Sequence, residues 1–225
     1  MKDTYFDKTP IISQDGSHTL FSKRFGEHYH SSFGAIQESS HIFIQAALSP
    51  FGKKLKSINL FEVGFGTGLN ALLAYQFALQ NNIIINYYSV EAFPVNSETV
   101  WELNYPELID LPAELFLKMH SKKDSGIVIS DLFNLTVYET SLQALHLPEN
   151  LFDVVFFDAF SPESQPEMWS LDVFNRIYSS MKRGGVLTTY SSKGIVKRAL
   201  KAAGFYIKKL PGPPGKREFV RAVKE

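Results

Sequence analysis

The stretch Ile58-Asn59-Leu60-Phe61-Glu62-Val63-Gly64-Phe65-Gly66-Thr67-Gly68-Leu69-Asn70 carries the strongest signal for the fold. Its apolar first half closes on the β-branched Val63 and predicts a buried strand, and the residues after Gly68 predict the start of an amphipathic helix. Glycine at every second position between them lets the backbone turn sharply and approach a ligand where a Cβ would collide. We expect a strand, a tight turn and a helix whose N-terminus faces a polar or anionic group of the ligand.

One acid separates this turn from the usual dinucleotide-binding fingerprint. Glu62 precedes Gly64 by two residues, and its carboxylate would repel a pyrophosphate. The same carboxylate suits a ligand that carries a positive charge or an amino group. The pattern E-x-G-x-G-x-G resembles the first motif of S-adenosylmethionine-dependent methyltransferases.

Acids also follow the next two predicted strands. The run 83–90 closes on Glu91, and the run 126–130 is followed by Asp131 and Leu132. In doubly wound nucleotide-binding folds an acid about 20 residues beyond the glycine turn binds the ribose hydroxyls, and we expect Glu91 to do so. Asp131 and Leu132 are expected to recognise the adenine amino group. Acids at three successive strand ends predict a single cofactor site.

The rest of the chain predicts a layered α/β fold. From Lys56 onward predicted strands and helices alternate, which is typical of a parallel sheet with helices on both faces. We expect a Rossmann-like sheet of seven strands, mostly parallel, with the last two joined as a hairpin so that one is antiparallel. Further helices are predicted at 34–48, 141–147, 168–181 and 193–203. Residues 1–56 are expected to form a small N-terminal extension of a hairpin and a helix, and residues 57–225 the main domain.

Composition excludes several classes of site. The chain has 225 residues, enough for one α/β domain, and no cysteine, which excludes disulfides, thiolate zinc sites and cysteine-based covalent catalysis. His28 and His30 would share a strand face, but with no third ligand nearby we expect no metal. No apolar stretch is long enough to span a membrane, and the N-terminus lacks a signal-peptide pattern, so we expect a cytoplasmic protein.

Charge is distributed unevenly along a chain whose net charge is zero. From Met181 to Glu225 twelve lysine and arginine residues stand against two glutamates, and the first 180 residues balance this excess. Such a segment is typical of a face that binds a polyanion. The alternative interpretation is a set of ordinary solvated helix and strand surfaces.

A carboxylate at the end of a central strand is the candidate for chemistry. The apolar run 152–157 predicts a strand buried on both faces, and Asp158, Phe160 and Pro162 follow it at the edge where such folds bind ligands. Methyltransferases that act on amino nitrogens commonly place there a polar group that holds the amine and an aromatic ring that stacks on the base. An ordinary aspartate has a pKa ~6 units below that of an alkylamine. We therefore expect Asp158 to orient the amine and stabilise the developing ammonium rather than to act as a base.

Several stretches together resemble one family. They are residues 15–20, 25–30, 38–41, 62–70, 158–162 with 166–169, and 212–218. They are similar to the tRNA 5-methylaminomethyl-2-thiouridine methyltransferases, which methylate the aminomethyl group of a modified wobble uridine, and the resemblance runs from about residue 13 onward. In some bacteria this methyltransferase is fused to an FAD-dependent oxidase. No segment here resembles the oxidase, so the resemblance implies a stand-alone S-adenosylmethionine-dependent tRNA methyltransferase without FAD.

The resemblance also implies roles for individual residues. Asp158 would face the amine, and S-adenosylmethionine would be held by Glu62, Gly64, Phe65, Gly66, Gly68, Asn70, Glu91, Asp131 and Leu132. The substrate would be a base splayed out of the single-stranded anticodon loop. It would meet Tyr29, His30, Phe160, Lys216 and Arg217.

Two alternatives remain open. A hairpin before a methyltransferase-like core also resembles aminopropyltransferases such as spermidine synthase, although the basic C-terminal segment disfavours a polycationic substrate. The other alternative is a non-catalytic RNA-binding protein, which the acids at four strand ends disfavour. The sequence leaves open the tRNA isoacceptors, the need for 2-thiolation, the source of the aminomethyl substrate and the oligomeric state.

Overall fold

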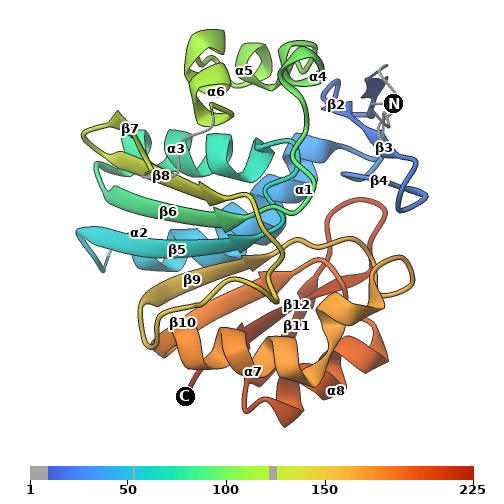
Figure 1. Ribbon diagram of the computed structural model, residues 1–225, viewed down its shortest axis with the longest axis vertical. Coiled ribbons are helices and arrows are strands. Elements are labelled where there is room, and N and C mark those ends of the chain that lie inside the picture. Colours follow the sequence, from blue (N-terminus) through green and yellow to red (C-terminus); the bar gives the residue numbers. More distant parts are fainter. Residues whose placement is uncertain (1–9, 53, 122–125) are drawn as a thin grey trace.

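The computed structural model describes residues 10–52, 54–121 and 126–225, which are built around an eight-stranded sheet (Figure 1). The strand order is β11-β12-β10-β9-β5-β6-β8-β7. The strands are β5 (Ser57–Val63), β6 (Ile84–Val90), β7 (Ile127–Ser130), β8 (Phe133–Tyr138), β9 (Phe152–Phe157), β10 (Met181–Thr189), β11 (Tyr206–Pro211) and β12 (Glu218–Val223). Strands β8, β6, β5, β9 and β10 run parallel, whereas β12 is antiparallel to β10 and β11. The predicted mostly parallel sheet with an antiparallel C-terminal pair is confirmed.

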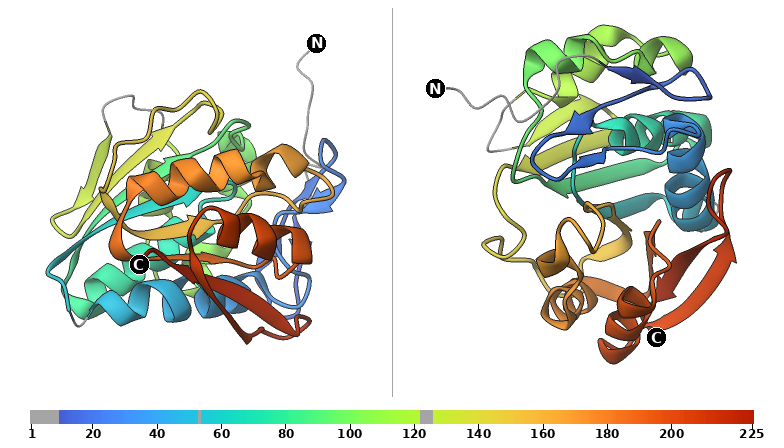
Figure 2. Two further views of the ribbon diagram at one scale, coloured as in Figure 1. Left: turned by 90° about the horizontal axis from the view of Figure 1, so that it is seen from below. Right: turned by 90° about the vertical axis from the view of Figure 1, so that its right-hand side faces the viewer.

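Helices cover both faces of the sheet (Figures 1 and 2). On one face lie α3 (Leu69–Asn81) and a continuous helical segment that precedes β5. The segment comprises α1 (Ala35–Ser39), the π-helical η1 (Ser40–Leu48) and α2 (Ser49–Gly52). The other face carries α7 (Leu171–Ser180) and α8 (Gly194–Ala202). Because side chains alternate along a strand, Leu60 joins the apolar cluster on the α3 side and Phe61 joins the cluster on the α7 side.

The N-terminal extension consists of two small hairpins and this helical segment. Strand β1 (Ile11–Ile12) pairs with β2 (His18–Thr19), and β3 (Phe21–Ser22) pairs with β4 (Glu27–His28). The helix predicted at 34–48 continues as far as Gly52. Its Ile42 and Phe43 are buried in the same apolar cluster as α3 and the sheet. The main sheet begins next to the predicted boundary at residue 56, but the apolar core is continuous across it.

The sheet differs from the prediction at one edge. The run 126–130, predicted as the third parallel strand, contains β7, an edge strand that is antiparallel to β8. Strand β8 pairs with β6 and takes the third parallel position, so the sheet has eight strands rather than seven. Strand β7 is a short apolar run and β8 alternates apolar and polar residues, and only their pairing in the assembled sheet tells which of them runs parallel.

The connections also depart from the sequence-based expectation. Three short helices, α4 (Ser97–Trp101), α5 (Tyr105–Leu108) and α6 (Ala113–Met119), lead from β6 towards β7. Residues 141–147 form turns instead of the predicted helix. The helix predicted at 168–181 is divided into a 3₁₀ turn, η2 (Pro166–Trp169), and α7, because the side chain of Ser170 accepts from the Val173 amide and caps α7. None of the described helices is long and apolar enough to cross a membrane.

Candidate active site

The glycine turn joins β5 to α3 as the sequence predicts. Gly64, Gly66 and Gly68 have positive φ angles of 91°, 52° and 77°, a region that residues with a Cβ rarely adopt. A Cβ on Gly64 would lie 2.7 Å from the carbonyl oxygen of Asp158, and one on Gly66 would lie 3.1 Å from the ring of Tyr29. The glycines therefore let the turn approach neighbouring segments as well as a ligand.

Two histidines from distant segments hold the centre of this turn. His30 places Nε2 2.7 Å from Thr67 Oγ1, and His120 donates from Nε2 to the Thr67 carbonyl oxygen at 3.1 Å. Burial lowers the pKa of both histidines to about 4. Both are neutral at neutral pH, so they fix the turn without adding charge beside it.

The histidine pair that the sequence singles out does not act as a unit. His28 is exposed and packs edge-on against Phe21, with ring centroids 5.1 Å apart, whereas His30 contacts the glycine turn. Within the described ranges, no group of three or more His, Cys, Asp or Glu residues could hold a metal ion.

Glu91 follows β6 directly and lies beside the glycine turn. Its Oε2 accepts a hydrogen bond from the Gly66 amide at 2.8 Å, and its Oε1 accepts one from the Phe93 amide at 2.7 Å. Burial raises the pKa of Glu91, and the backbone donors act in the opposite direction. A carboxylate has about four lone-pair sites, so Glu91 can still accept hydrogen bonds from a ligand.

The turn opens into a cavity of about 630 Å³ at the carboxyl edge of the sheet. Residues 25–33 of the N-terminal extension form one side of its wall, and residues 140–143 after β8 form another. This volume lies within the usual range for a small-molecule site. The predicted residues in the wall are Tyr29, His30, Gly64, Phe65, Gly66, Asn70, Glu91, Asp158, Phe160 and Lys216.

Asp131 and Leu132 lie elsewhere, and their predicted position at the cofactor site is wrong. They form the turn between β7 and β8, where the Leu132 carbonyl oxygen accepts from the amide of Ile85 near the start of β6. This is the amino edge of the parallel strands, opposite the glycine turn. Because β8 is the third parallel strand, the residues that follow its carboxyl end take the predicted place, and Thr140 and Ser141 line the cavity. If the sequence had indicated β8 as the third parallel strand, it would also have pointed to Thr140 and Ser141 as cavity residues.

Three other predicted residues are not part of the cavity wall. Arg217 is exposed next to the start of β12. Gly68 lies against His120, since a Cβ there would be 2.6 Å from Nε2. Glu62 is completely buried at the end of β5, behind the turn rather than in contact with the cavity.

Asp158 lies in the cavity wall directly after β9. The side chain of Asn70 donates from Nδ2 to Oδ2 of Asp158 at 2.8 Å. Burial raises the pKa of Asp158 to about 7, with a further contribution from Glu38, while Lys216 acts in the opposite direction. Near neutral pH this aspartate therefore exchanges readily between its ionised and protonated forms.

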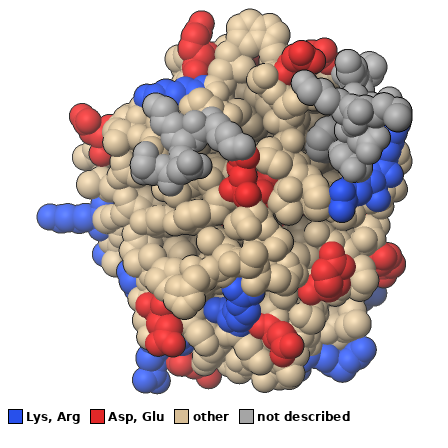
Figure 3. Space-filling model, in the orientation of Figure 1, with Lys and Arg blue, Asp and Glu red and all other residues tan. Residues whose placement is uncertain are grey.

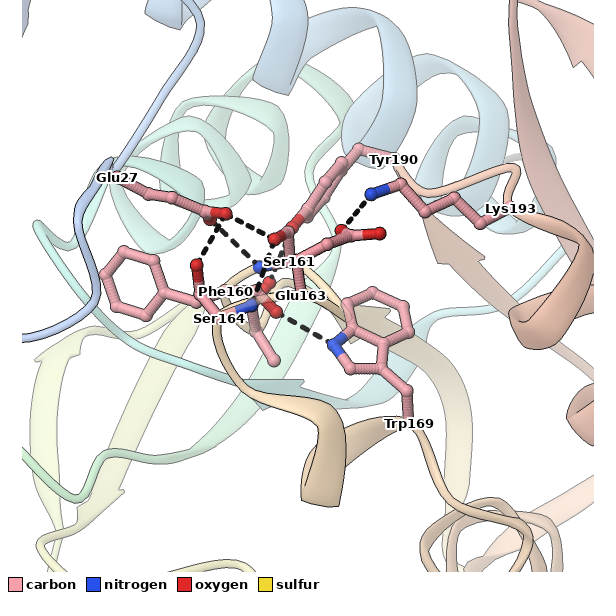
Figure 4. A network of polar contacts seen from close by, with 9 residues as sticks. Glu27, Phe160, Ser161, Glu163, Ser164, Trp169, Tyr190 and Lys193 are labelled. Atoms are coloured by element: carbon pink, nitrogen blue, oxygen red, sulfur yellow. Dashed lines mark hydrogen bonds and ion pairs between the residues drawn. The ribbon is translucent and has the colours of Figure 1, made fainter.

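Hydrogen bonds join the N-terminal extension to the loop that follows Asp158 (Figure 4). Glu27 accepts hydrogen bonds from the Ser161 amide at 3.1 Å, from the Ser164 hydroxyl at 2.7 Å and from the Ser161 hydroxyl. An ion pair between Lys193 and Glu163 adds an exposed contact to the same loop. The sequence gives no sign of this role of Glu27, because nothing in the local pattern links Glu27 to a loop more than a hundred residues away.

Two aromatic residues hold the same loop from the other side (Figure 4). Trp169 donates from Nε1 to the Phe160 carbonyl oxygen at 2.8 Å, and the Tyr190 hydroxyl donates to the Ala159 carbonyl oxygen at 2.9 Å. Side chains from several elements thus form hydrogen bonds with the backbone of the segment beside Asp158. These bonds favour a constant position of the carboxylate.

Phe160 belongs to an aromatic cluster in the cavity wall. Phe25 stacks on its ring with centroids 4.3 Å apart, and Tyr29 meets it edge-on at 5.1 Å. Phe93 packs against Phe25 in turn, at 5.8 Å. The sequence identifies Phe160 and Tyr29 but not Phe25 or Phe93, whose positions depend on how the extension folds back over the sheet.

Lys216 lies beside the cavity, as the sequence predicts, but it is paired within the protein. It forms an ion pair with Glu38, and its Nζ lies 4.2 Å from the centroid of the Tyr190 ring. At the neighbouring Gly215 a Cβ would lie 2.3 Å from the ring of Phe33. The tip of the β11–β12 hairpin therefore packs against the N-terminal extension and closes one side of the cavity.

Several lysines of the basic C-terminal segment are engaged in ion pairs. Lys182 pairs with Asp153 at 2.8 Å, and Lys197 and Lys209 pair with Glu218 at 3.4 Å and 2.9 Å. On the face that Figure 3 shows, lysines and arginines are interspersed with acids. The positive excess of the sequence is not gathered into one continuous patch on that face.

Comparison with known proteins gives consistent matches. A family model described as S-adenosyl-L-methionine-dependent methyltransferase matches residues 109–225. The chain is 32% identical over 218 residues to the tRNA 5-methylaminomethyl-2-thiouridine biosynthesis bifunctional protein MnmC of Nitrosospira multiformis, and 30% identical over 235 residues to that of Burkholderia multivorans. These alignments cover 90% and 96% of this chain but 35% of each relative. The chain thus spans about a third of the length of these relatives.

Solved structures share the fold. MNMC2 from Aquifex aeolicus matches with a TM-score of 0.81 and 26% identity, over 99% of this chain and 71% of that chain. Spermidine synthase from Thermotoga maritima matches with a TM-score of 0.57 and 12% identity, over 98% of this chain and 72% of that chain. At that identity the second likeness concerns the fold alone.

The matched half of the chain contains Asp158 and the antiparallel C-terminal strands, and the glycine turn precedes it. Gly64, Gly66 and Glu91 border the same cavity of about 630 Å³ at the carboxyl edge of the sheet, so the site fits S-adenosyl-L-methionine, the cofactor that the sequence predicts. This chain belongs to the family of S-adenosyl-L-methionine-dependent methyltransferases.

Proposed function

We propose that this chain methylates the amino nitrogen of 5-aminomethyl-(2-thio)uridine at the wobble position of tRNA. The observation that carries the proposal is Asp158, an acid with a raised pKa in the wall of the cavity that also borders the glycine turn. The relatives named MnmC, which by name take part in tRNA 5-methylaminomethyl-2-thiouridine biosynthesis, support it, because they align with nearly all of this chain. Since the chain aligns with about a third of their length, the proposal is limited to the methyl-transfer step.

The cofactor is proposed to lie between the glycine turn and the end of β6. The backbone at Gly64 and Gly66 can approach it closely because neither residue has a Cβ. Glu91 would accept the ribose hydroxyls through lone pairs that the backbone donors leave open. Thr140 and Ser141, which line the cavity after β8, would take the place beside the adenine that the sequence assigned to Asp131.

The bound cofactor supplies an activated methyl group, and the protein has to position the acceptor and manage one proton. Asn70 engages Oδ2 of Asp158, so we assign Oδ1 to the amine. With a pKa of about 7, Asp158 is only ~3 units below an alkylamine near 10, a difference of ~4 kcal/mol. Burial thus changes the role expected from the sequence: Asp158 accepts the proton of the incoming ammonium, which frees the amine lone pair for the methyl group. After that proton is lost to solvent, the carboxylate faces the methylated ammonium.

The wobble base would enter from the aromatic side of the cavity. A base in the single-stranded anticodon loop can be unstacked at modest cost and stacked on protein rings, and Tyr29 and Phe160 are in place for this. Arg217, exposed beside the hairpin tip, is assigned to the phosphate backbone, while Lys216 shapes the cavity through its pair with Glu38. We also propose a cytoplasmic location, as the sequence predicts.

Aminopropyl transfer to a polyamine is the rival reaction. The cavity wall contains Glu27, Glu38, Glu91 and Glu167 in addition to Asp158, and acids suit a polyamine as well as an aminomethyl group. However, Glu38 is already paired with Lys216, and Glu27 is engaged by Ser161. Their commitment to protein partners favours a substrate with a single amine.

Methyl transfer to defined acceptors separates these functions. We expect label from methyl-labelled S-adenosyl-L-methionine in tRNA isolated from cells that lack this methyl group, and none in tRNA that already carries it. With decarboxylated S-adenosylmethionine and putrescine we expect no aminopropylated product. Conversion of putrescine without labelling of tRNA would overturn the proposal.

A further inference from the structure

A second carboxyl group lies beneath the cavity, next to Asp158. Glu62 ends the apolar run of β5 and is 0% exposed. The Ser89 hydroxyl donates to its Oε2 at 3.0 Å. Asn70 lies between the two acids, since it interacts with Glu62 and donates to Asp158. The two carboxyl groups are therefore coupled through one amide side chain.

The groups that face Glu62 carry no positive charge. They are Tyr87 and Ser89 from β6, Asn70 from α3 and Asp158 after β9. On the cavity side, Glu38 and Lys216 act on Asp158 and pair with each other. An ionised carboxylate that is completely buried without a cation is strongly disfavoured, and a neighbouring carboxylate disfavours it further.

The unsatisfied atoms around this carboxyl show where a proton would fit. Among the described residues, Glu62 Oε1, Asn70 Oδ1 and Tyr87 Oη are buried and lack a hydrogen-bond partner. With Glu62 ionised, Oε1 is an acceptor whose neighbouring donor is the Tyr87 hydroxyl, and Asn70 Oδ1 is left without a donor. A proton on Oε1 turns it into a donor for a neighbouring oxygen and removes part of the cost of leaving these atoms unpaired.

We propose that Glu62 is protonated at neutral pH and acts as a positioning residue that, through Asn70, keeps the single negative charge of the two acids on Asp158. Burial and the Asp158 carboxylate raise the pKa of Glu62 well above its ordinary value and outweigh the hydrogen bonds from Asn70, Ser89 and Tyr87, which act in the opposite direction. Only the role given to Asp158 rests on the proposed function. The proton on Glu62 follows from burial and from the neighbouring groups, and it gives this acid a different task from that of a carboxylate that binds the cofactor.

A carboxyl that keeps its proton on folding makes stability depend on pH. Its folded pKa lies above the unfolded value near ~4.3, so the folded state binds one proton that the unfolded state has lost. The stabilisation is complete below the unfolded pKa and is lost as pH rises towards the folded pKa. In this window the unfolding equilibrium constant increases about tenfold per pH unit from this group alone.

The test is urea unfolding of the full chain between about pH 6 and pH 8. Glutamine is neutral at every pH and keeps a hydrogen-bond donor and an acceptor. In Glu62→Gln the slope of the unfolding free energy against pH should therefore decrease by the contribution of one proton. Glu91→Gln is the matched control, because backbone amides donate to both oxygens of Glu91 and a glutamine amide can accept only one of them. We expect that control to destabilise the protein while its slope falls by less than that of Glu62→Gln. An unchanged slope in Glu62→Gln would overturn the proposal.

A second measurement covers the case in which Glu62→Gln fails to fold. The infrared C=O band of a protonated carboxyl should be present in the wild-type protein at about pH 8, above the pKa of Asp158. Its absence would overturn the proposal whatever the variants do. Neither readout involves tRNA. If Glu62→Gln lowers the slope of stability against pH but the wild-type protein labels no tRNA, Glu62 is protonated and the proposed substrate is rejected. If the wild-type protein labels tRNA but the slope in Glu62→Gln is unchanged, only the role of Glu62 is rejected.

Discussion

The two sides of the cavity are built in different ways. The proposed cofactor side consists of the glycine turn and Glu91, and the Gly66 amide joins the two directly by donating to Glu91. The acceptor side is assembled from the N-terminal extension, the loop after β9 and the β11–β12 hairpin. Contacts such as Glu27 with Ser161 join parts that are 134 residues apart in sequence. In the proposed function, cofactor binding depends on a local motif and acceptor chemistry depends on long-range packing, so substitutions on the two sides should affect different kinetic steps.

The largest effect is expected on the acceptor side, at Asp158. Asp158→Ala removes the group that accepts the proton and faces the developing charge, and general acid–base assistance contributes roughly 10²–10⁴-fold. We expect kcat for tRNA methylation to fall by that factor while calorimetry gives nearly unchanged S-adenosyl-L-methionine affinity. A loss confined to cofactor affinity would show that Asp158 acts in cofactor binding and not on the acceptor.

A smaller effect, of the opposite type, is expected at Glu91. Glu91→Ala removes a charge-assisted hydrogen bond to the cofactor, worth roughly 1.5–3 kcal/mol, so cofactor affinity should fall about 10- to 150-fold. Glu98→Ala, in the exposed start of α4, is the matched control and should bind the cofactor normally. Unchanged affinity in a folded Glu91 variant would contradict the role proposed for Glu91.

The pH dependence should distinguish proton transfer to Asp158 from simple orientation. With a pKa of about 7, Asp158 takes up a proton below that pH, so kcat/KM should rise about tenfold per pH unit up to pH 7. It should then stay level, because the complex of ionised Asp158 with the ammonium form keeps a constant population until the amine titrates near ~10. In Asp158→Asn, kcat/KM should keep rising above pH 7. A wild-type profile that also keeps rising would show that solvent removes the proton.

The smallest effect is expected at the basic hairpin tip, where two neighbouring residues provide a comparison. Arg217 is exposed and Lys216 is paired with Glu38, so Arg217→Ala should reduce the salt slope of tRNA affinity by about one phosphate contact. Lys216→Ala should leave that slope unchanged and alter turnover instead. Equal changes in slope for both variants would show that Lys216 leaves Glu38 when tRNA binds.

The sequence could predict the cofactor side because its signals are local. Glycines that need positive φ and an acid after the next parallel strand are both encoded by short patterns. The prediction for Asp131 was wrong for a physical reason: β7 and β8 are adjacent short segments, and only pairing with β6 determines which one ends at the cavity.

The acceptor side could be predicted only in part. Asp158, Phe160 and Tyr29 carry recognisable chemistry, but Glu27, Glu38 and Phe25 acquire their roles through contacts with distant segments. Glu62 shows a further limit, because the motif predicts an acid at the cofactor and not whether burial keeps that acid protonated. The charge state of a buried group depends on all of its neighbours, which no short pattern specifies.

The most direct test of the central claim is the position of the transferred methyl group. The wobble nucleoside of tRNA that lacks this modification is analysed by mass spectrometry after incubation with S-adenosyl-L-methionine and either wild-type protein or Asp158→Asn. We predict one added methyl group on the aminomethyl nitrogen with wild-type protein, and a rate lower by about 10²–10⁴-fold with the variant. A methyl group elsewhere on the tRNA, or an equal rate with both proteins, would contradict the account.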